Sequence, residues 1–198
     1  FLNFTTDYTY YYPDYVPAQW VLDLYDSGDM RYNAYFANAQ TGYSHQLVWP
    51  LLVKYYGNEG LIQNLIYHVN MPKPLRLAEQ YLIRAEAYCE KGNYSSASAD
   101  LSELRQTRFT AGGSISVNAA NWKATISDER VRELYMEGFR LHDLKRWGMG
   151  FERTPQSQTQ SEGSSLKIEA NDPLFVWPIP NQEIVAPGSQ IQPNESNR

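Results

Sequence analysis

The sequence predicts a mainly α-helical protein, built on tetratricopeptide-like helix pairs, with long irregular loops and few short strands. Residues 75–109 carry apolar side chains at three- and four-residue spacing on both sides of a Gly-Asn break, which is typical of two antiparallel helices. Residues 127–147 crowd charges onto a further helical pattern. Residues 1–74 are aromatic and punctuated by glycine, and they lack a long helical period, which favours strands and loops.

Residues 1–74 form the loop-rich part of the chain. We expect residues 1–12 to be extended and to end at Pro13. Residues 17–25 should form a helix, because a proline stands near its first turn and Ser27-Gly28 closes it. Residues 32–70 predict short strands and loops.

Residues 75–109 predict a helical hairpin. The first helix carries Leu82 and Ala85 on its apolar stripe, Gly92-Asn93 ends it, and Ala97 and Leu101 begin the second stripe. Small alanines at this spacing let two helices approach closely, as in a tetratricopeptide pair. One pair cannot bury its own face, so it needs either the later helix or further repeats before Phe1.

Residues 127–147 predict a single charged helix of about five turns. Ser127 is a suitable N-cap, Lys145 lies in the last turn, and Gly148 follows it. Three glutamates four residues apart would repel one another unless cations lie between them. We therefore predict a structural ion-pair network, which comprises Glu129, Arg130, Glu133, Glu137, Arg140, Asp143 and Arg146. Residues 75–198 should form a C-terminal domain that closes with a wrapping tail, and the whole chain should be one folded unit.

Glu133 and Glu137 offer an alternative, because two carboxylates one turn apart roughly fit a glycoside hydrolase. An arginine within helical reach of each keeps both ionised, however, and leaves no acid of raised pKa. The histidines have no metal-ligand spacing, and the lone Cys89 has no feature that would activate its thiol. The sequence therefore predicts no catalytic residue, no metal site and no cofactor.

Tyrosines are crowded near the start of the chain, where five fall within eight residues. A tyrosine ring offers a flat apolar face and a polar tip, which suits stacking on sugar rings. The alternative is an alternating strand that half-buries these rings. On the binding hypothesis the candidate ligand-binding residues are Tyr8, Tyr10, Tyr11, Tyr12 and Trp20.

Composition limits the possible partners. With 17 basic and 22 acidic residues the net charge is −5, and no Lys/Arg cluster could neutralise a run of phosphates, so we expect no nucleic-acid partner. The longest apolar run falls far short of the ~20 residues that cross a bilayer. The chain lacks an initiator Met and a cleavable leader, and we interpret it as the downstream part of a longer protein.

Four blocks of residues carry a family resemblance. They are residues 76–88, Ala97-x-x-Asp100-Leu101-x-x-Leu104-Arg105, Glu129-Arg130-x-x-Glu133-Leu134-x-x-Glu137-Gly138-x-Arg140-x-x-Asp143-Leu144-x-Arg146-Trp147-Gly148, and Trp177-Pro178-Ile179-Pro180-x-x-Glu183-Ile184. Their order and spacing resemble the C-terminal half of the SusD/RagB family. Tyr15-x-Pro17 and Asp29-x-Arg31-Tyr32 are similar to that family's middle region, whereas the tail at residues 190–194 departs from the family pattern.

The resemblance implies a SusD-like α/α superhelical fold and a lipoprotein on the outward face of the outer membrane of Bacteroidetes. Such a protein binds a nutrient glycan, or in some members a peptide, and delivers it to a SusC-like TonB-dependent transporter. It is a binder and not an enzyme, and a lipid anchor upstream of this chain would attach it to the membrane. No ligand-contacting residue can be transferred from the family, because those residues lie in variable loops.

Overall fold

The computed structural model describes residues 2–4, 11–13, 15–42, 48–66, 69–71, 73–153 and 167–197. It divides the chain into two compact units, Phe1–Tyr135 and Met136–Arg198. The expected boundary at residue 75 and the expectation of one folded unit remain predictions. Among the described residues, none of the helices combines the length and the apolarity needed to cross a bilayer.

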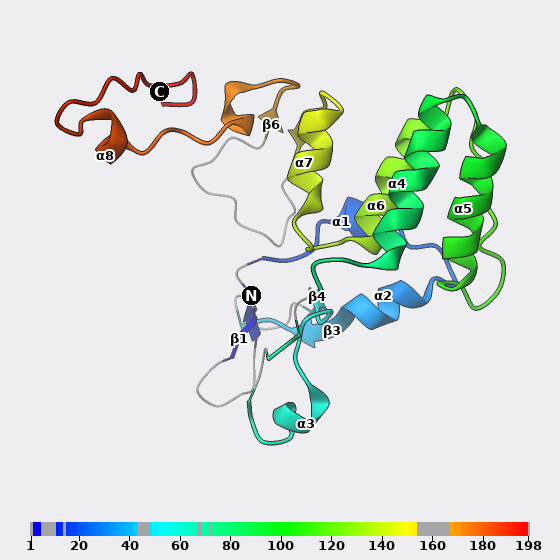
Figure 1. Ribbon diagram of the computed structural model, residues 1–198. Coiled ribbons are helices and arrows are strands. Elements are labelled where there is room, and N and C mark those ends of the chain that lie inside the picture. Colours follow the sequence, from blue (N-terminus) through cyan, green and yellow to red (C-terminus); the bar gives the residue numbers. More distant parts are fainter. Residues whose placement is uncertain are drawn as a thin grey trace. The chain divides into compact units, whose positions relative to one another are not determined.

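The first unit contains six helices and two strand pairs among its described residues (Figure 1). The helices are α1 (Gln19–Leu22), α2 (Met30–Tyr35), α3 (Glu59–Ile62), α4 (Leu77–Glu90), α5 (Tyr94–Gln106) and α6 (Trp122–Glu133). The antiparallel pairs are β1 (Leu2–Phe4) with β2 (Tyr11–Pro13) and β3 (Phe36–Gln40) with β4 (Val48–Leu52). Short strands and long connections in residues 1–74 agree with the predicted fold class.

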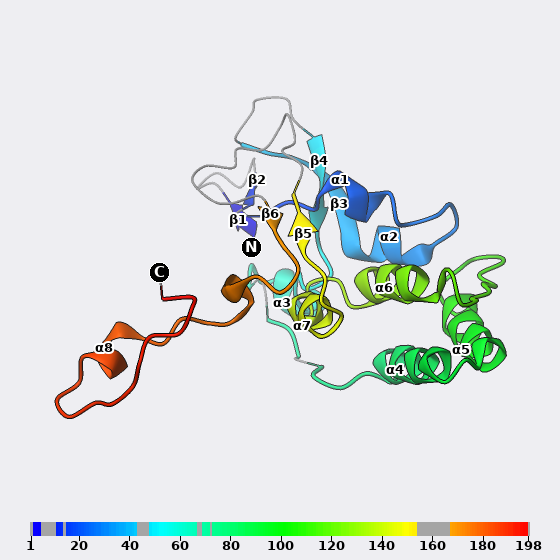
Figure 2. The same ribbon diagram turned by 90° about the horizontal axis from the view of Figure 1, so that it is seen from above.

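The α4–α5 hairpin confirms the predicted tetratricopeptide-like pair. Leu82, Ala85, Ala97 and Leu101 are fully buried, so the alanine-rich stripes of the two helices face each other. Gly92 adopts a left-handed φ of 73° in the connection, and Asn93 caps α5 by accepting a hydrogen bond from the Ser96 backbone N–H. α6 packs along α4, and Figure 2 shows the helices of the hairpin end-on beside it. The later helix therefore covers one face of the pair.

The predicted single helix over residues 127–147 is wrong. α6 begins at Trp122 and ends at Glu133. Its N-cap is Asn121, and the predicted N-cap, Ser127, lies buried inside the helix. A second helix begins only at Phe139. Met136 (φ 59°) and Gly138 (φ 86°) adopt left-handed backbone conformations between the two helices, and a right-handed helix cannot continue through them.

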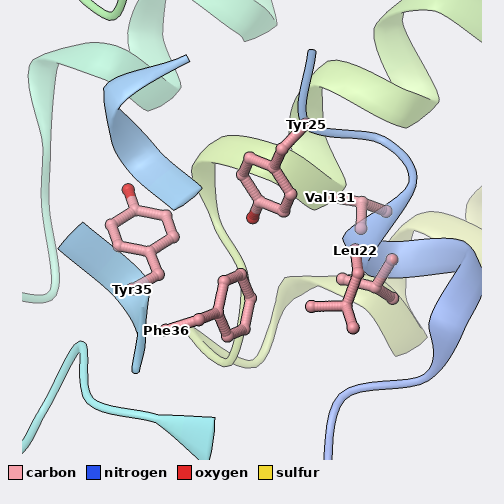
Figure 3. Packing of buried hydrophobic residues seen from close by; sticks show 6 residues of the cluster. Leu22, Tyr25, Tyr35, Phe36 and Val131 are labelled. Carbon is pink, nitrogen blue, oxygen red and sulfur yellow. The ribbon is translucent and has the colours of Figure 1, made fainter. Parts of the chain in front are cut away.

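An apolar core joins α1, α2 and β3 to α6. It comprises Val21, Leu22, Tyr25, Tyr35, Phe36 and Val131. The rings of Tyr25 and Phe36, both labelled in Figure 3, pack edge to face. Their centroids are 5.6 Å apart. α1 has only four residues and cannot be stable alone, so this packing fixes which of its side chains face outward.

The second unit is small and loop-rich. Its elements are α7 (Phe139–Arg146), β5 (Phe151–Glu152), β6 (Lys167–Ile168), a 3₁₀ turn at Pro173–Phe175 and α8 (Asn181–Ile184). β5 and β6 pair antiparallel. Trp177 follows the 3₁₀ turn and is 81% exposed.

Candidate functional site

Two strongly exposed aromatic side chains of the first unit lie at and just before α1. Tyr15 is 73% exposed and Trp20 is 48% exposed. The Trp49 indole Nε1–H donates to the Pro17 carbonyl at 3.2 Å and so fixes the chain where α1 begins. We call Tyr15, Gln19, Trp20 and Asp23 the α1 surface.

The α1 surface pairs a flat ring with polar groups. The Gln19 side-chain amide donates to Asp23 Oδ1 at 2.7 Å, and both side chains are exposed beside Trp20. Val21 and Leu22 point into the core, so the helix turns Trp20 away from it. An exposed indole flanked by an amide and a carboxylate can stack on a sugar ring and accept hydrogen bonds from its hydroxyl groups.

The other candidate ligand-binding residues are less fully described. Tyr8 and Tyr10 lie outside the described residues. Tyr11 and Tyr12 belong to β2, where they pair with Phe4 and Asn3 of β1, and their side chains lie outside the described part of the chain. Of the five residues, Trp20 therefore has a described side chain, and that side chain reaches the surface.

The first unit also contains a buried charge cluster centred on Arg31, between α2 and α6. Asp29 caps α2 by accepting from the Arg31 backbone N–H, and its carboxylate also binds the Arg31 guanidinium at 2.9 Å and 2.7 Å. Nη1 of the same guanidinium donates to Glu129 at 2.7 Å and to Glu133 at 3.1 Å. Arg31 thus links the start of α2 to two successive turns of α6.

Glu129 is fully buried and receives two further cations. Arg105 of α5 donates to it at 2.6 Å and Arg132 donates from the next turn of α6 at 3.0 Å. Burial by itself would raise the pKa of Glu129, but the charges of Arg31, Arg132 and Arg105 outweigh burial and lower that pKa. The carboxylate therefore stays ionised in the folded protein.

Glu133, also fully buried, is held by a fork of arginines. Arg108 binds it bidentately at 2.9 Å and 2.9 Å, and Arg76 donates to Glu133 Oε1 at 2.9 Å. Burial again raises the pKa, but the hydrogen bonds from Arg108 and Arg76 and the positive charges lower it to about 2. A carboxylic acid of such low pKa cannot protonate a leaving group near neutral pH, so Glu133 is unsuited to be the acid of a hydrolase.

Side chains from elsewhere in unit 1 cap the C-terminal end of α6. The Lys54 ammonium donates to the carbonyls of Glu133 and Tyr135, both at 3.1 Å, and Arg76 donates to the Glu133 carbonyl at 2.8 Å. The Tyr25 hydroxyl donates to the Arg132 carbonyl at 3.0 Å. Cations at this end also oppose the negative pole of the helix, which accounts for its stop at Glu133.

The predicted ion-pair network is distributed differently in the structure. Of its seven residues, Glu129 and Glu133 lie in the cluster and Arg130 lies buried in α6. Glu137 falls past the end of α6, and the remaining three belong to α7, where Arg146 binds Asp143 at 3.0 Å. The structural partners that the sequence interpretation missed are Asp29, Arg31, Arg76, Arg105, Arg108 and Arg132. Within the described residues, no group of three His, Cys, Asp or Glu side chains could hold a metal ion.

The first unit combines a helical hairpin of tetratricopeptide type with an irregular aromatic segment, and buried ion pairs hold the two together. This arrangement defines the class of the protein as a mainly α, repeat-like fold. The family model of the SusD family matches residues 2–195, and the chain belongs to that family.

Individual relatives agree with this assignment. Over 74 residues the chain is 43% identical to the starch-binding protein SusD of Bacteroides thetaiotaomicron, a match that covers 37% of this chain and 12% of that protein. A solved SusD superfamily protein from Bacteroides thetaiotaomicron superposes with a TM-score of 0.64 at 27% identity, over 89% of this chain and 40% of its own. A solved SusD-like carbohydrate binding protein from Bacteroides vulgatus gives a TM-score of 0.57 at 27% identity, over 69% and 28%. The chain thus spans less than half the length of these relatives.

Proposed function

We propose that this chain is part of a cell-surface protein that binds oligosaccharide nutrients and delivers them to a SusC-like TonB-dependent transporter. Membership of the SusD family over residues 2–195 is the observation that carries the proposal. Two relatives, described as starch-binding and carbohydrate binding, support a glycan as the ligand. The site of action is the outward face of the outer membrane, and attachment is through a lipid anchor upstream of this chain.

The α1 surface is the proposed contact with the glycan. Trp20 provides the stacking platform, Asp23 and Gln19 provide hydrogen-bond partners, and the tyrosines at positions 8, 10, 11 and 12 extend the aromatic surface. Binding breaks no bond, because the glutamate best placed for acid catalysis is ionised and enclosed by arginines. The buried charge cluster holds α2, which follows α1 in the chain, against α6.

Trp20→Ala tests the contact. Isothermal titration of the chain with a panel of oligosaccharides should identify a binder, and the variant should weaken it about tenfold, which corresponds to about 1.4 kcal/mol. Trp177→Ala is the matched control, because Trp177 is an even more exposed indole in the second unit. Loss of affinity in Trp177→Ala with none in Trp20→Ala would place the contact elsewhere.

A peptide ligand is the alternative within the same family. If a peptide library returns binders and the oligosaccharide panel returns none, the chain is a RagB-like peptide-binding member. In that case capture of an extended strand at a free sheet edge would replace stacking on aromatic rings.

A further inference from the structure

The net charge of the chain is concentrated in its aromatic N-terminal segment. Residues 1–30 contain five of the 22 acidic residues and none of the 17 basic residues, so the remainder of the chain is neutral in sum. The five are Asp7, Asp14, Asp23, Asp26 and Asp29. The same thirty residues carry six tyrosines and Trp20, so the proposed glycan contact and the negative charge coincide in sequence.

The described aspartates differ in what faces them. Asp29 is buried, and its charge is balanced by the ion pair with Arg31. Asp23 is exposed and is the C-cap of α1, three residues after Trp20, so the two side chains are neighbours at the end of the helix. The Asp26 side chain is 64% exposed, and its Oδ2 accepts from the Arg105 guanidinium at 3.4 Å, so Asp26 is exposed but paired. At least two carboxylates of this segment therefore reach solvent.

Three arginines that contact the described part of this segment are turned inward. The side chains of Arg31, Arg105 and Arg132 are only 2%, 7% and 9% exposed, and each binds Glu129. Arg132 also donates to the carbonyl of Leu24, two residues after the end of α1, at 3.1 Å. Recognition of a sugar carboxylate or sulfate depends on guanidinium or ammonium groups that reach the ligand, and these three guanidiniums are buried and already bind carboxylates of the protein.

We infer that the oligosaccharide bound at the α1 surface is uncharged, and that glycans carrying carboxylates or sulfates bind there more weakly. The inference rests on the proposed glycan-binding function and adds the chemical class of the ligand. The exposed carboxylate of Asp23 accepts hydrogen bonds from the hydroxyl groups of a neutral sugar. Two like unit charges about 6 Å apart in water weaken binding by about threefold, so the Asp23 carboxylate disfavours an anionic sugar group that binds at such a distance.

Isothermal titration of the full chain with two matched panels tests the inference. The uncharged panel contains hexamers of maltose-, xylose-, cellulose- and mannan-type oligosaccharides, and the anionic panel contains oligogalacturonate, oligoalginate and chondroitin sulfate hexamers. We expect at least one uncharged hexamer to bind with an affinity that changes little between low salt and physiological salt. We expect every anionic hexamer to bind at least threefold more weakly than that ligand at low salt.

Two variants separate charge exclusion from shape exclusion. Asp23→Asn should improve the binding of the anionic hexamers about threefold at low salt, and the gain should shrink as salt screens the carboxylate. Glu90→Gln removes the same charge from an exposed position at the end of α4 and should leave both panels unchanged.

Three outcomes are distinguishable. Preference for an uncharged hexamer, together with the Asp23→Asn effect, supports the inference. Tighter binding of an anionic hexamer than of every uncharged one overturns the inference and leaves the proposed glycan-binding function standing. Binding of neither panel overturns the proposed function, and the inference that rests on it falls too.

Discussion

Replacing Arg31 by methionine should strongly destabilise the first unit. Methionine fills similar volume but has no charge, so Asp29 loses its bidentate partner while Glu129 and Glu133 each lose one of their cations. Removing one partner of a buried ion pair costs about 3–5 kcal/mol, because the remaining charge is left desolvated. Glu129 keeps Arg105 and Arg132, and Glu133 keeps Arg76 and Arg108, which places the expected loss within that range and not above it.

Urea unfolding followed by circular dichroism measures this loss. For a chain of this size, about 3–5 kcal/mol corresponds to a fall in melting temperature of roughly 6–20 °C. Lys167→Met is the control, because Lys167 also lies 2.7 Å from its partner, Glu169, yet these side chains are 55% and 71% exposed. An exposed pair contributes little, so the control should unfold like the unmodified chain.

A companion variant tells charge loss from poor packing. Asp29→Asn keeps an oxygen that can cap α2 but removes the carboxylate that faces Arg31. If the charges are coupled, the double variant Arg31→Met with Asp29→Asn should be less destabilised than the sum of the two single variants. An Arg31→Met chain that unfolds at the same urea concentration as the unmodified chain would refute the view that the cluster clamps α2 to α6.

Two further predictions concern α6 and its end. The folded-state pKa of Glu133, about 2, is below its unfolded value of 4.5, so its contribution is complete above about pH 5 and is lost as pH falls through about 2. Urea unfolding at pH 7 and pH 2 should show about 3 kcal/mol of acid-sensitive stability that Glu133→Gln lacks, and an equal pH dependence in that variant would contradict the assignment. Gly138→Ala should cost about 1 kcal/mol, because φ is 86° there while no atom lies within 4 Å of the added Cβ. Gly60→Ala, at a position without a left-handed φ, is the control, and equal losses in thermal melts would show that φ at Gly138 is unimportant.

The helical hairpin could be predicted because its determinants are local. Leu82, Ala85, Ala97 and Leu101 reveal their stripes through three- and four-residue spacing, and Gly92-Asn93 has the chemistry of a stop followed by a cap. The structure places all four side chains in the core. Such patterns need no knowledge of which distant segment packs against them.

The cations of the buried cluster could not be predicted in the same way. Spacing along a helix reveals only partners three or four residues away, so it directed the search for partners of Glu129 and Glu133 to Arg130 and Arg140. The arginines that bind these glutamates include Arg31 and Arg76, which are 98 and 57 residues away from the glutamates they contact. Only Arg132, at the i+3 position from Glu129, offered a local signal, and it was overlooked.

The stop of α6 was missed for a related reason. Gly138 was visible in the sequence, but the acidic start and basic end of residues 127–147 resembled the two ends of one long helix. Lys54 and Arg76 supply the missing information, since they occupy the Glu133 carbonyl that a continuing helix would use for the N–H of residue 137. A local pattern therefore described a helix that tertiary hydrogen bonds end early.

The buried cluster and the α1 surface are connected through the arginines. Arg31, Arg105 and Arg132 would be the natural ligands of an anionic sugar if they pointed outward, but Glu129 draws all three into the interior. Each of these cations is thereby withdrawn from the surface, and among the described contacts none of the three binds the exposed Asp23 beside Trp20. The same ion pairs that hold α2 to α6 thus keep these arginines out of the α1 surface, so the stability of the fold and the proposed preference for a neutral ligand would have one physical origin.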